Sequence, residues 1–238
     1  MIYKKFAEVY DELMYDFPYE KISNFINERL EGKTHTLLEI ACGTGNFTKI
    51  FAKKYEVNAF DISEEMLAIA QNKVKNVFFF KQDMKKFKTP KTYDAILSLC
   101  DSYNYILKEE ELFLSFECVK RALNPGGIFI FDLNTKEKFE SMENIYLDEN
   151  EDVFYTWENY FDRGKEINHY CVNFFIKGEK DTYKRFYEEH LERAYRSDEI
   201  IKLLKEAGFN RIEVYKDYEN INEIEGAKRL VFVAYKEQ

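Results

Sequence analysis

The sequence predicts an α/β fold: a doubly wound, mostly parallel, seven-stranded sheet with helices on both faces and a small inserted antiparallel sheet. The first observation is that short, near-continuous apolar runs alternate with helical patterns through residues 34–133. This alternation is typical of parallel strands buried on both faces. The second is that after residue 134 the chain changes to long segments of β character joined by glycine-containing turns, which indicates hairpins.

Two amphipathic helices are expected before the first strand. Apolar side chains recur at helical spacing through residues 3–17, and Pro18 ends that run. The second helix carries an apolar face that ends at Leu30, with Gly32 suited to its C-terminal cap. We expect residues 1–33 to form a helical lid on the main domain.

The predicted main sheet is built from seven apolar strands. A helix around Phe47–Phe51 follows the first of them, a helix carrying Met66–Val74 follows the second, and a helix over 109–123 precedes the fifth. A further helix is expected over 198–207, with Ser197 as its N-cap. The last two strands follow this helix and close the chain. The strands are expected at residues 34–41, 57–61, 76–80, 93–100, 128–133, 211–215 and 229–235.

The insert is expected over residues 135–195. Three segments with β character, 152–161, 166–176 and 182–195, are joined by the turns DRGK and KGEK. They predict a three-stranded antiparallel sheet that walls an acceptor pocket, and their many aromatic side chains favour an aromatic lining. Residues 1–134 and 196–238 then form the cofactor-binding domain.

Composition excludes several classes of protein. The formal net charge is −9 at pH 7, which disfavours nucleic acid as a partner. No apolar run approaches the ~18 residues of a membrane span, and the charged N-terminus does not match an export signal. Four separated cysteines without a CxxC pair argue against a metal site. We therefore expect a cytoplasmic protein with reduced thiols, no metal, and no membrane partner.

The most informative motif is a glycine loop between the first strand and the following helix. Gly43 and Gly45 allow a tight turn and a close approach of the backbone to a ligand. The second strand ends in Asp61, 16 residues after Gly45. An acid at that position can accept hydrogen bonds from both hydroxyls of a ribose. The motif therefore predicts a nucleoside-containing cofactor.

Two cofactor classes use this geometry. A dinucleotide site requires a third glycine, and here that position is Thr48. Glu39, just before the loop, is out of place beside a pyrophosphate but suits a cation. S-adenosylmethionine has an ammonium and a sulfonium and no phosphate, so the loop favours this methyl donor. An NAD-dependent oxidoreductase and a non-catalytic S-adenosylmethionine-binding protein remain alternatives.

Several segments together resemble the class I S-adenosylmethionine-dependent methyltransferases. They are LLEIACGTGNFT, FDIS, SEEMLAIA, KQDM, YDAILSLCDSYNYI and LNPGGIFIFDL. The segments YKKFAEVYDELM and HLERAYRSDEIIKLLKEAGF are similar to a bacterial small-molecule subgroup with an antiparallel insert after the fifth strand, whose relatives include amino-sugar N-methyltransferases. The sequence departs from the family at Ala41, where glycine is common, and at FDLNT, which lacks a Pro-Trp continuation.

The resemblance implies a role for individual residues in holding S-adenosylmethionine. Asp61 would take the ribose hydroxyls. The adenine would lie against Ile62, Asp83 and Met84. The methionyl part would lie against Ala41, Gly43, Gly45, Leu99 and Cys100, near Glu39. Tyr10 would cover the reactive methyl group.

The expected function is methyl transfer to nitrogen or oxygen of a small-molecule acceptor. Asp101, Ser102, Tyr105 and His190 are candidates for orienting or deprotonating that acceptor. Strand alternation groups His190 with Phe186 on one face, so ordinary cross-strand packing is the alternative for this histidine. The sequence leaves open whether the chain forms a homodimer.

Overall fold

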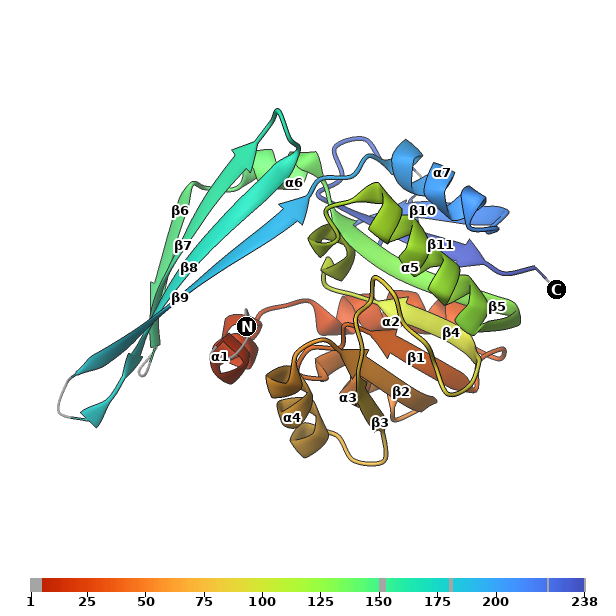
Figure 1. Ribbon diagram of the computed structural model, residues 1–238, viewed down its shortest axis with the longest axis horizontal. Helices are drawn as coiled ribbons and strands as arrows, with labels where there is room; N and C mark the ends of the chain where they lie inside the picture. The colour runs from red at the N-terminus through yellow and green to blue at the C-terminus, as the bar shows by residue number, and fades with distance from the viewer. Residues whose placement is uncertain (1–5, 150–152, 180–181, 222, 238) are drawn as a thin grey trace.

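The computed structural model describes residues 6–149, 153–179, 182–221 and 223–237. Within them, seven strands form one sheet in the order β10-β11-β5-β4-β1-β2-β3. Strands β3, β2, β1, β4 and β5 run parallel, while β11 is antiparallel to both of its neighbours. Helices cover both faces of this sheet (Figure 1). The predicted doubly wound, mostly parallel sheet is therefore confirmed.

The strands of the main sheet lie close to their predicted positions. The central strands β1, β2, β4, β5 and β11 are mostly buried, as expected for strands covered on both faces, whereas the edge strands β3 and β10 are more exposed. Their bounds are β1 Thr36–Ile40, β2 Glu56–Asp61, β3 Phe78–Lys81, β4 Tyr93–Ser98, β5 Leu123–Asn134, β10 Arg211–Lys216 and β11 Arg229–Tyr235.

The helices also follow the predicted order, with shifted ends. The helix expected over 3–17 is described only from residue 6, and it ends at Leu13. Pro18 does not end this helix; it directly precedes the next one. The helix expected to begin after Ser197 begins at Ser197 itself. The bounds are α1 Phe6–Leu13, α2 Tyr19–Leu30, α3 Asn46–Phe51, α4 Glu64–Lys73, α5 Glu109–Ala122, α6 Lys136–Ser141, α7 Ser197–Glu206 and the 3-10 helix η1 Ser102–Tyr105.

The inserted sheet has four strands where three were expected, so that prediction was wrong. The order is β6-β7-β8-β9, and all neighbouring strands are antiparallel. The additional strand, β6, pairs with β7 through five residues. The bounds are β6 Ile145–Glu149, β7 Val153–Asp162, β8 Ile167–Lys177 and β9 Tyr183–Arg193.

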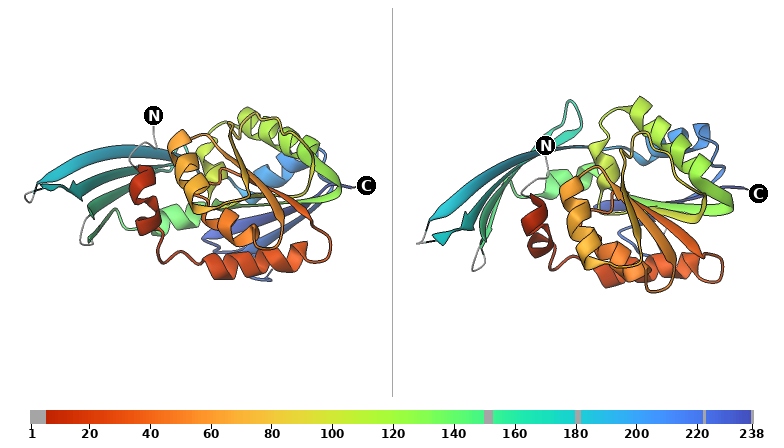
Figure 2. Two further views of the ribbon diagram at one scale, coloured as in Figure 1. Left: turned by 90° about the horizontal axis from the view of Figure 1, so that it is seen from below. Right: turned by 60° about the horizontal axis from the view of Figure 1, so that its bottom comes forward.

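The insert sheet projects from the α/β body, and α1 lies between the two (Figures 1 and 2). Ala7 of α1 belongs to a buried cluster with Met66 of α4 and with Val153, Val172 and Phe174 of the insert. This face of the insert, which we call the inner face, is apolar where it meets α1. Helix α1 therefore bridges the two parts of the molecule at their junction.

The main core stabilises the sheet from which the site is built. Aromatic rings of Phe129, Phe131 and Phe232 stack across β5 and β11, and Tyr103 of η1 packs on Phe131 with its hydroxyl bonded to Ser115. Burial of such rings supplies much of the hydrophobic stabilisation of a domain. Among the described residues no helix is long and apolar enough to cross a membrane.

Candidate active site

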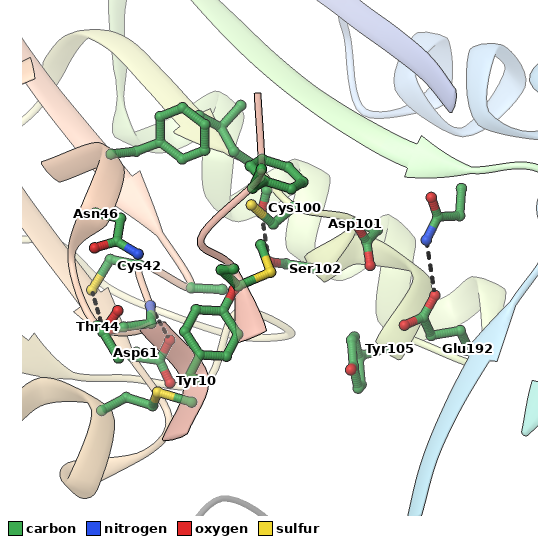
Figure 3. A pocket seen from close by; sticks show the side chains of 18 of the residues that line it. Tyr10, Cys42, Thr44, Asn46, Asp61, Cys100, Asp101, Ser102, Tyr105 and Glu192 are labelled. Atoms are coloured by element: carbon green, nitrogen blue, oxygen red, sulfur yellow. Dashed lines mark hydrogen bonds between the residues drawn. The ribbon is translucent and has the colours of Figure 1, made fainter. Parts of the chain in front are cut away.

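A cavity of about 720 Å³ lies at the carboxyl ends of the parallel strands, between the body and the insert. Ligands of open α/β sheets bind at this edge, and volumes of ~300–1,000 Å³ are usual for small-molecule sites. Its lining comes from α1, the glycine loop, the ends of β2, β4 and β5, and the inner face of the insert. Figure 3 shows Asp61 and Thr44 on one side and Glu192 on the other, with Tyr10 between them.

The glycine loop turns through three residues with positive φ. Ala41, Gly43 and Gly45 have φ of 54°, 54° and 78°. Ala41 and Gly43 line the cavity. Gly45 does not line it; a Cβ there would lie 3.1 Å from the Cβ of Ala70 on α4. Gly45 therefore permits the close packing of the loop against α4, while the other two positions face the ligand.

Asp61 lies at the end of β2 and is 7% exposed. Its Oδ2 accepts a hydrogen bond from the Gly43 N–H at 2.8 Å, and its Oδ1 accepts one from the Ser63 N–H at 2.9 Å. Burial raises the pKa of Asp61, and the backbone hydrogen bonds oppose that rise. The Ile62 N–H also opposes the rise in pKa. Because a carboxylate has about four acceptor sites, Asp61 keeps capacity for a further donor.

Glu39 is buried at the end of β1 and lines the same part of the cavity. The Thr48 hydroxyl donates to its carboxylate. Burial, with a smaller contribution from the nearby Asp61, raises the pKa of Glu39 to about 8, and the hydrogen bond from Thr48 opposes the rise. A ligand cation beside Glu39 would favour its charged form. Thr48 stands where a dinucleotide-binding motif has its third glycine, and its side chain hydrogen-bonds to Glu39.

The end of β3 supplies the next part of the lining. Asp83 and Met84 follow β3, and Ile62 follows β2; all three line the cavity. Asp83 also closes a turn, because its Oδ1 accepts from the Lys85 N–H at 2.9 Å. Ile62 is half exposed, which leaves an apolar side chain at the rim. The structure therefore brings Ile62, Asp83 and Met84 into the lining of one cavity.

The turn after β4 is strained. Leu99, Cys100 and Asp101 line the cavity, and the last two are consecutive non-glycine residues with φ of 59° and 53°. The left-handed conformation costs ~1–2 kcal/mol for such residues, and strain of this kind concentrates at functional sites. Ser102 stabilises the turn by donating to the Leu99 carbonyl at 2.9 Å.

Helix α1 is tied to the glycine loop by Asp11. Its Oδ1 accepts from the Thr44 hydroxyl at 2.6 Å and from the Asn46 amide at 3.0 Å, and Lys73 donates to Oδ2 at 2.6 Å. The neighbouring residue, Tyr10, lines the cavity, and burial raises its pKa well above the usual range. The bonds to Asp11 thus hold Tyr10 over the cavity.

The side of the cavity nearest the insert carries a cluster of charged groups. Arg229 of β11 pairs with Asp101 at 2.7 Å and with Asp132. Glu192 of β9 is 2% exposed, and the Asn134 amide donates to its carboxylate at 3.3 Å. Burial and the nearby Asp101 raise the pKa of Glu192 well above its ordinary value. The insert adds aromatic side chains to this wall: Tyr146, Tyr155, Trp157 and Tyr170.

His190 does not line the cavity. It is buried behind Tyr105, whose hydroxyl lies 3.3 Å from His190 Nδ1, and its Nε2 lies 3.4 Å from Glu188. Tyr105, in contrast, lines the cavity together with Asp101 and Ser102. Three of the four acceptor-side candidates therefore lie together, and His190 lies behind Tyr105 outside the lining.

Sequence reasoning missed several residues that line the cavity or support its lining, among them Glu192, Asn134, Asp132, Asp11 and Arg229. Glu192 was detectable, because it shares the alternation that assigns Phe186 and His190 to one face of its strand. Asp132 was detectable as an acid inside a buried apolar strand. Asp11 and Arg229 carried no signal of their own, since their partners lie far away in the chain.

Comparison with known proteins gives a consistent result. A family model described as a methyltransferase domain matches residues 37–127. The Bacillus subtilis (strain 168) protein YqeM, named as a methyltransferase, is 34% identical over 99% of this chain and 98% of its own. The dTDP-3-amino-3,4,6-trideoxy-alpha-D-glucopyranose N,N-dimethyltransferase of Streptomyces venezuelae is 28% identical over 53% of this chain and 56% of its own.

A solved structure agrees over the whole chain. The crystal structure of an S-adenosylmethionine-dependent methyltransferase from Clostridium acetobutylicum ATCC 824 has a TM-score of 0.87 and 33% identity, and the match covers 99% of each chain. These similarities decide against the alternative of an NAD-dependent oxidoreductase. The chain belongs to the class I S-adenosylmethionine-dependent methyltransferases.

Proposed function

We propose that this methyltransferase transfers the methyl group of S-adenosylmethionine to a nitrogen or oxygen atom of a small-molecule acceptor. One observation carries the proposal. A single cavity of about 720 Å³ joins the glycine loop and Asp61 to the charged and aromatic wall of the insert. A donor at one end and an acceptor at the other would share one continuous space, which methyl transfer requires.

The residues at the glycine-loop end fit the methyl donor. Asp61 is a carboxylate with about four acceptor sites. The Gly43 and Ser63 N–H groups use two of them, and we assign ribose hydroxyls to the remaining capacity. Glu39 is a buried acid that a ligand ammonium would stabilise in its charged form. No phosphate is expected beside these two carboxyl groups. The site therefore suits a nucleoside with a positively charged amino acid portion.

The remaining contacts follow from position along the strand ends. We assign the adenine to the space beside Ile62, Asp83 and Met84, and the methionyl portion to the space beside Ala41, Gly43, Leu99 and Cys100. Gly45 acts through the packing of the loop on α4.

The chain's contribution to the reaction is position and exclusion of water. S-adenosylmethionine supplies an electrophilic methyl group on a sulfonium, so no elaborate catalytic group is needed. Tyr10 lies between the two ends of the cavity (Figure 3), and α1 closes the junction between body and insert. Holding the two reactants in line within a closed site supplies much of the acceleration of such displacements.

Thermal unfolding with S-adenosylmethionine, S-adenosylhomocysteine and NAD in parallel tests the cofactor assignment. A ligand at 100 times its dissociation constant stabilises the folded protein by ~2.7 kcal/mol, which corresponds to roughly 5–10 °C for this size. We expect that shift with both sulfur ligands. A shift with NAD alone would contradict the proposal.

Asp61→Asn tests the ribose contact. We expect this variant to lose most of the shift with S-adenosylhomocysteine, because an amide accepts fewer hydrogen bonds than a carboxylate. Asp198→Asn, at an exposed position of α7, is the matched control and should keep the full shift. An unchanged shift in Asp61→Asn would refute the assigned role. Release of S-adenosylhomocysteine across pools of small amines and alcohols then tests the acceptor.

A further inference from the structure

We propose that Glu192 and Asn134 form the acceptor subsite, that the acceptor is an amine which enters as an ammonium ion, and that Glu192 receives the proton which this amine loses. The inference rests on the proposed function, because it assigns the acceptor side of the same cavity. It starts from a buried acid on the insert and from an amide at the end of β5 (Figure 3).

The first observation is the geometry of the two side chains. Glu192 and Asn134 are 2% and 4% exposed, and both line the cavity. The Asn134 amide nitrogen donates to Glu192 Oε2 at 3.3 Å. Asn134 Oδ1 is buried and has no hydrogen-bond partner among the described residues. A buried acceptor without a partner costs ~1–3 kcal/mol, and a ligand donor would satisfy it.

The second observation is the kind of hydrogen bond that the subsite offers. Asn134 Oδ1 can act only as an acceptor. The Glu192 carboxylate, when it is ionised, can also act only as an acceptor. The backbone N–H of Asn134 is already used by Asn104 Oδ1 at 2.9 Å. A ligand held by Asn134 Oδ1 and the ionised Glu192 must therefore donate. An ammonium group donates to both at once, and its charge favours the ionised form of Glu192. A carboxylate acceptor has no donor to offer.

The third observation is charge. Arg229 is paired with Asp101 and Asp132, whereas no ion pair joins Glu192 to a lysine or arginine in the part of the chain that the structure describes. The groups that face Glu192 from the surrounding elements are Asp101, Tyr105, Asn134, Lys138, Tyr170, His190 and Arg229. Asp132 also belongs to this group through its pair with Arg229. Three acids, Asp101, Asp132 and Glu192, therefore outnumber the one arginine and the one lysine. A cationic acceptor restores the balance, and an anionic one worsens it.

These features define the proton transfer. The ammonium ion gives one N–H proton to the Glu192 carboxylate, which leaves the nitrogen lone pair free. The nitrogen then forms a bond to the methyl carbon while the carbon–sulfur bond breaks, and the bonding pair stays on sulfur. Burial raises the pKa of Glu192, so this carboxylate is a stronger base than an exposed one.

The test is thermal unfolding of the full chain with saturating S-adenosylhomocysteine and a second probe. Two matched trios serve as probes: phenethylamine, phenethyl alcohol and phenylacetate; glucosamine, glucose and glucuronate. We expect at least one amine to raise the melting temperature above that with S-adenosylhomocysteine alone, and to do so more than its matched alcohol and acid. The proposal is wrong if no amine stabilises, or if an alcohol or acid stabilises more than its amine.

Glu192→Gln assigns the effect to the residue. We expect the dissociation constant of the amine to rise by about 10- to 100-fold, since hydrogen bonds to charged groups contribute ~1.5–3 kcal/mol. Glu192→Asp keeps the charge and should retain part of the amine shift. Glu189→Gln is the matched control, because Glu189 lies on the same strand but is exposed on the opposite face. It should keep the whole shift.

Three outcomes are distinguished. If the amine shift survives Glu192→Gln, the assignment of Glu192 is refuted. If Glu192→Gln does not fold, Asn134→Ala takes its place with the same expected loss, and an unchanged amine shift there refutes the subsite. If S-adenosylhomocysteine itself gives no shift in the wild type, the proposed function fails, and not the acceptor inference alone.

Discussion

Ala41 is a non-glycine residue in the left-handed conformation, with φ of 54°. Glycine adopts this conformation without strain. We predict that Ala41→Gly stabilises the folded protein by about 0.5–1 kcal/mol, because relief of ~1–2 kcal/mol of strain exceeds the entropy that glycine adds to the unfolded chain. Urea unfolding of the ligand-free protein measures the change.

Ala68→Gly on α4 is the control for that prediction. Ala68 is exposed in the middle of a helix, where glycine costs about 1 kcal/mol relative to alanine. The two substitutions are chemically identical and should have opposite signs. Equal destabilisation by both would mean that the backbone at Ala41 carries no strain.

Glu39 predicts a pH dependence of stability. Its pKa is about 8 in the folded protein against an ordinary value of 4.5, so folding favours the protonated acid. The stability from this group is complete below about pH 4.5 and is lost as the pH rises to about 8. The slope approaches ~1.4 kcal/mol per pH unit. We predict that Glu39→Gln removes this slope in the ligand-free protein.

Urea unfolding at several pH values between 5 and 8, at roughly one-unit steps, measures that difference. Glu31→Gln, at an exposed position after α2, serves as the control and should follow the wild type. Parallel stability curves for the wild type and Glu39→Gln would show that the buried acid does not titrate in this range.

A residue of the site could be predicted where the motif that identifies it lies close to it in the sequence. Asp61 follows a strand and a glycine loop at a spacing visible in the sequence, and the structure joins its Oδ2 to the Gly43 N–H. Arg229 gave no such signal, because its partner Asp101 lies 128 residues away in the chain. Pairing across that separation depends on which strands become neighbours in the sheet.

At the scale of elements, α1 is the part whose position controls the closure of the cavity. Asp11 holds it to the glycine loop and to Lys73. We predict that Asp11→Ala raises the dissociation constant of S-adenosylhomocysteine about tenfold, since charge-assisted hydrogen bonds contribute ~1.5–3 kcal/mol. Calorimetric titration measures the constant.

Glu219→Ala is the control for the loss of an ion pair alone. Glu219 pairs with Lys21 at 2.9 Å, and both side chains are about half exposed, so its loss should cost less than ~1 kcal/mol. Its substitution should leave the dissociation constant unchanged. An unchanged constant in Asp11→Ala as well would show that α1 does not help to hold the cofactor.

Most strands of the main sheet were predictable because they are buried apolar runs bounded by polar residues. Strand β6 was not, because Ile145–Glu149 is short, its Ile145, Tyr146 and Leu147 are exposed, and it is an edge strand. Its extended conformation depends on its antiparallel pairing with β7. Helix α6, between β5 and the insert, was not predicted either, because it is short.

At the scale of the whole molecule, an α/β body and a four-stranded insert meet at α1 (Figures 1 and 2). The class of the fold followed from periodicity alone. The joining of the two sheets around one cavity did not, because it depends on long-range contacts such as those of Ala7 with Val153 and Phe174. The body then supplies the cofactor end of the cavity, and the insert supplies the acceptor wall.

A crystal structure of the protein with S-adenosylhomocysteine tests the central claim most directly. The account predicts that both ribose hydroxyls lie within hydrogen-bond distance of the Asp61 carboxylate, with the adenine beside Ile62 and Asp83. The end of the cavity at Glu192 should remain free for the acceptor. A nucleoside bound outside this cavity, or one whose ribose lies away from Asp61, would contradict the account.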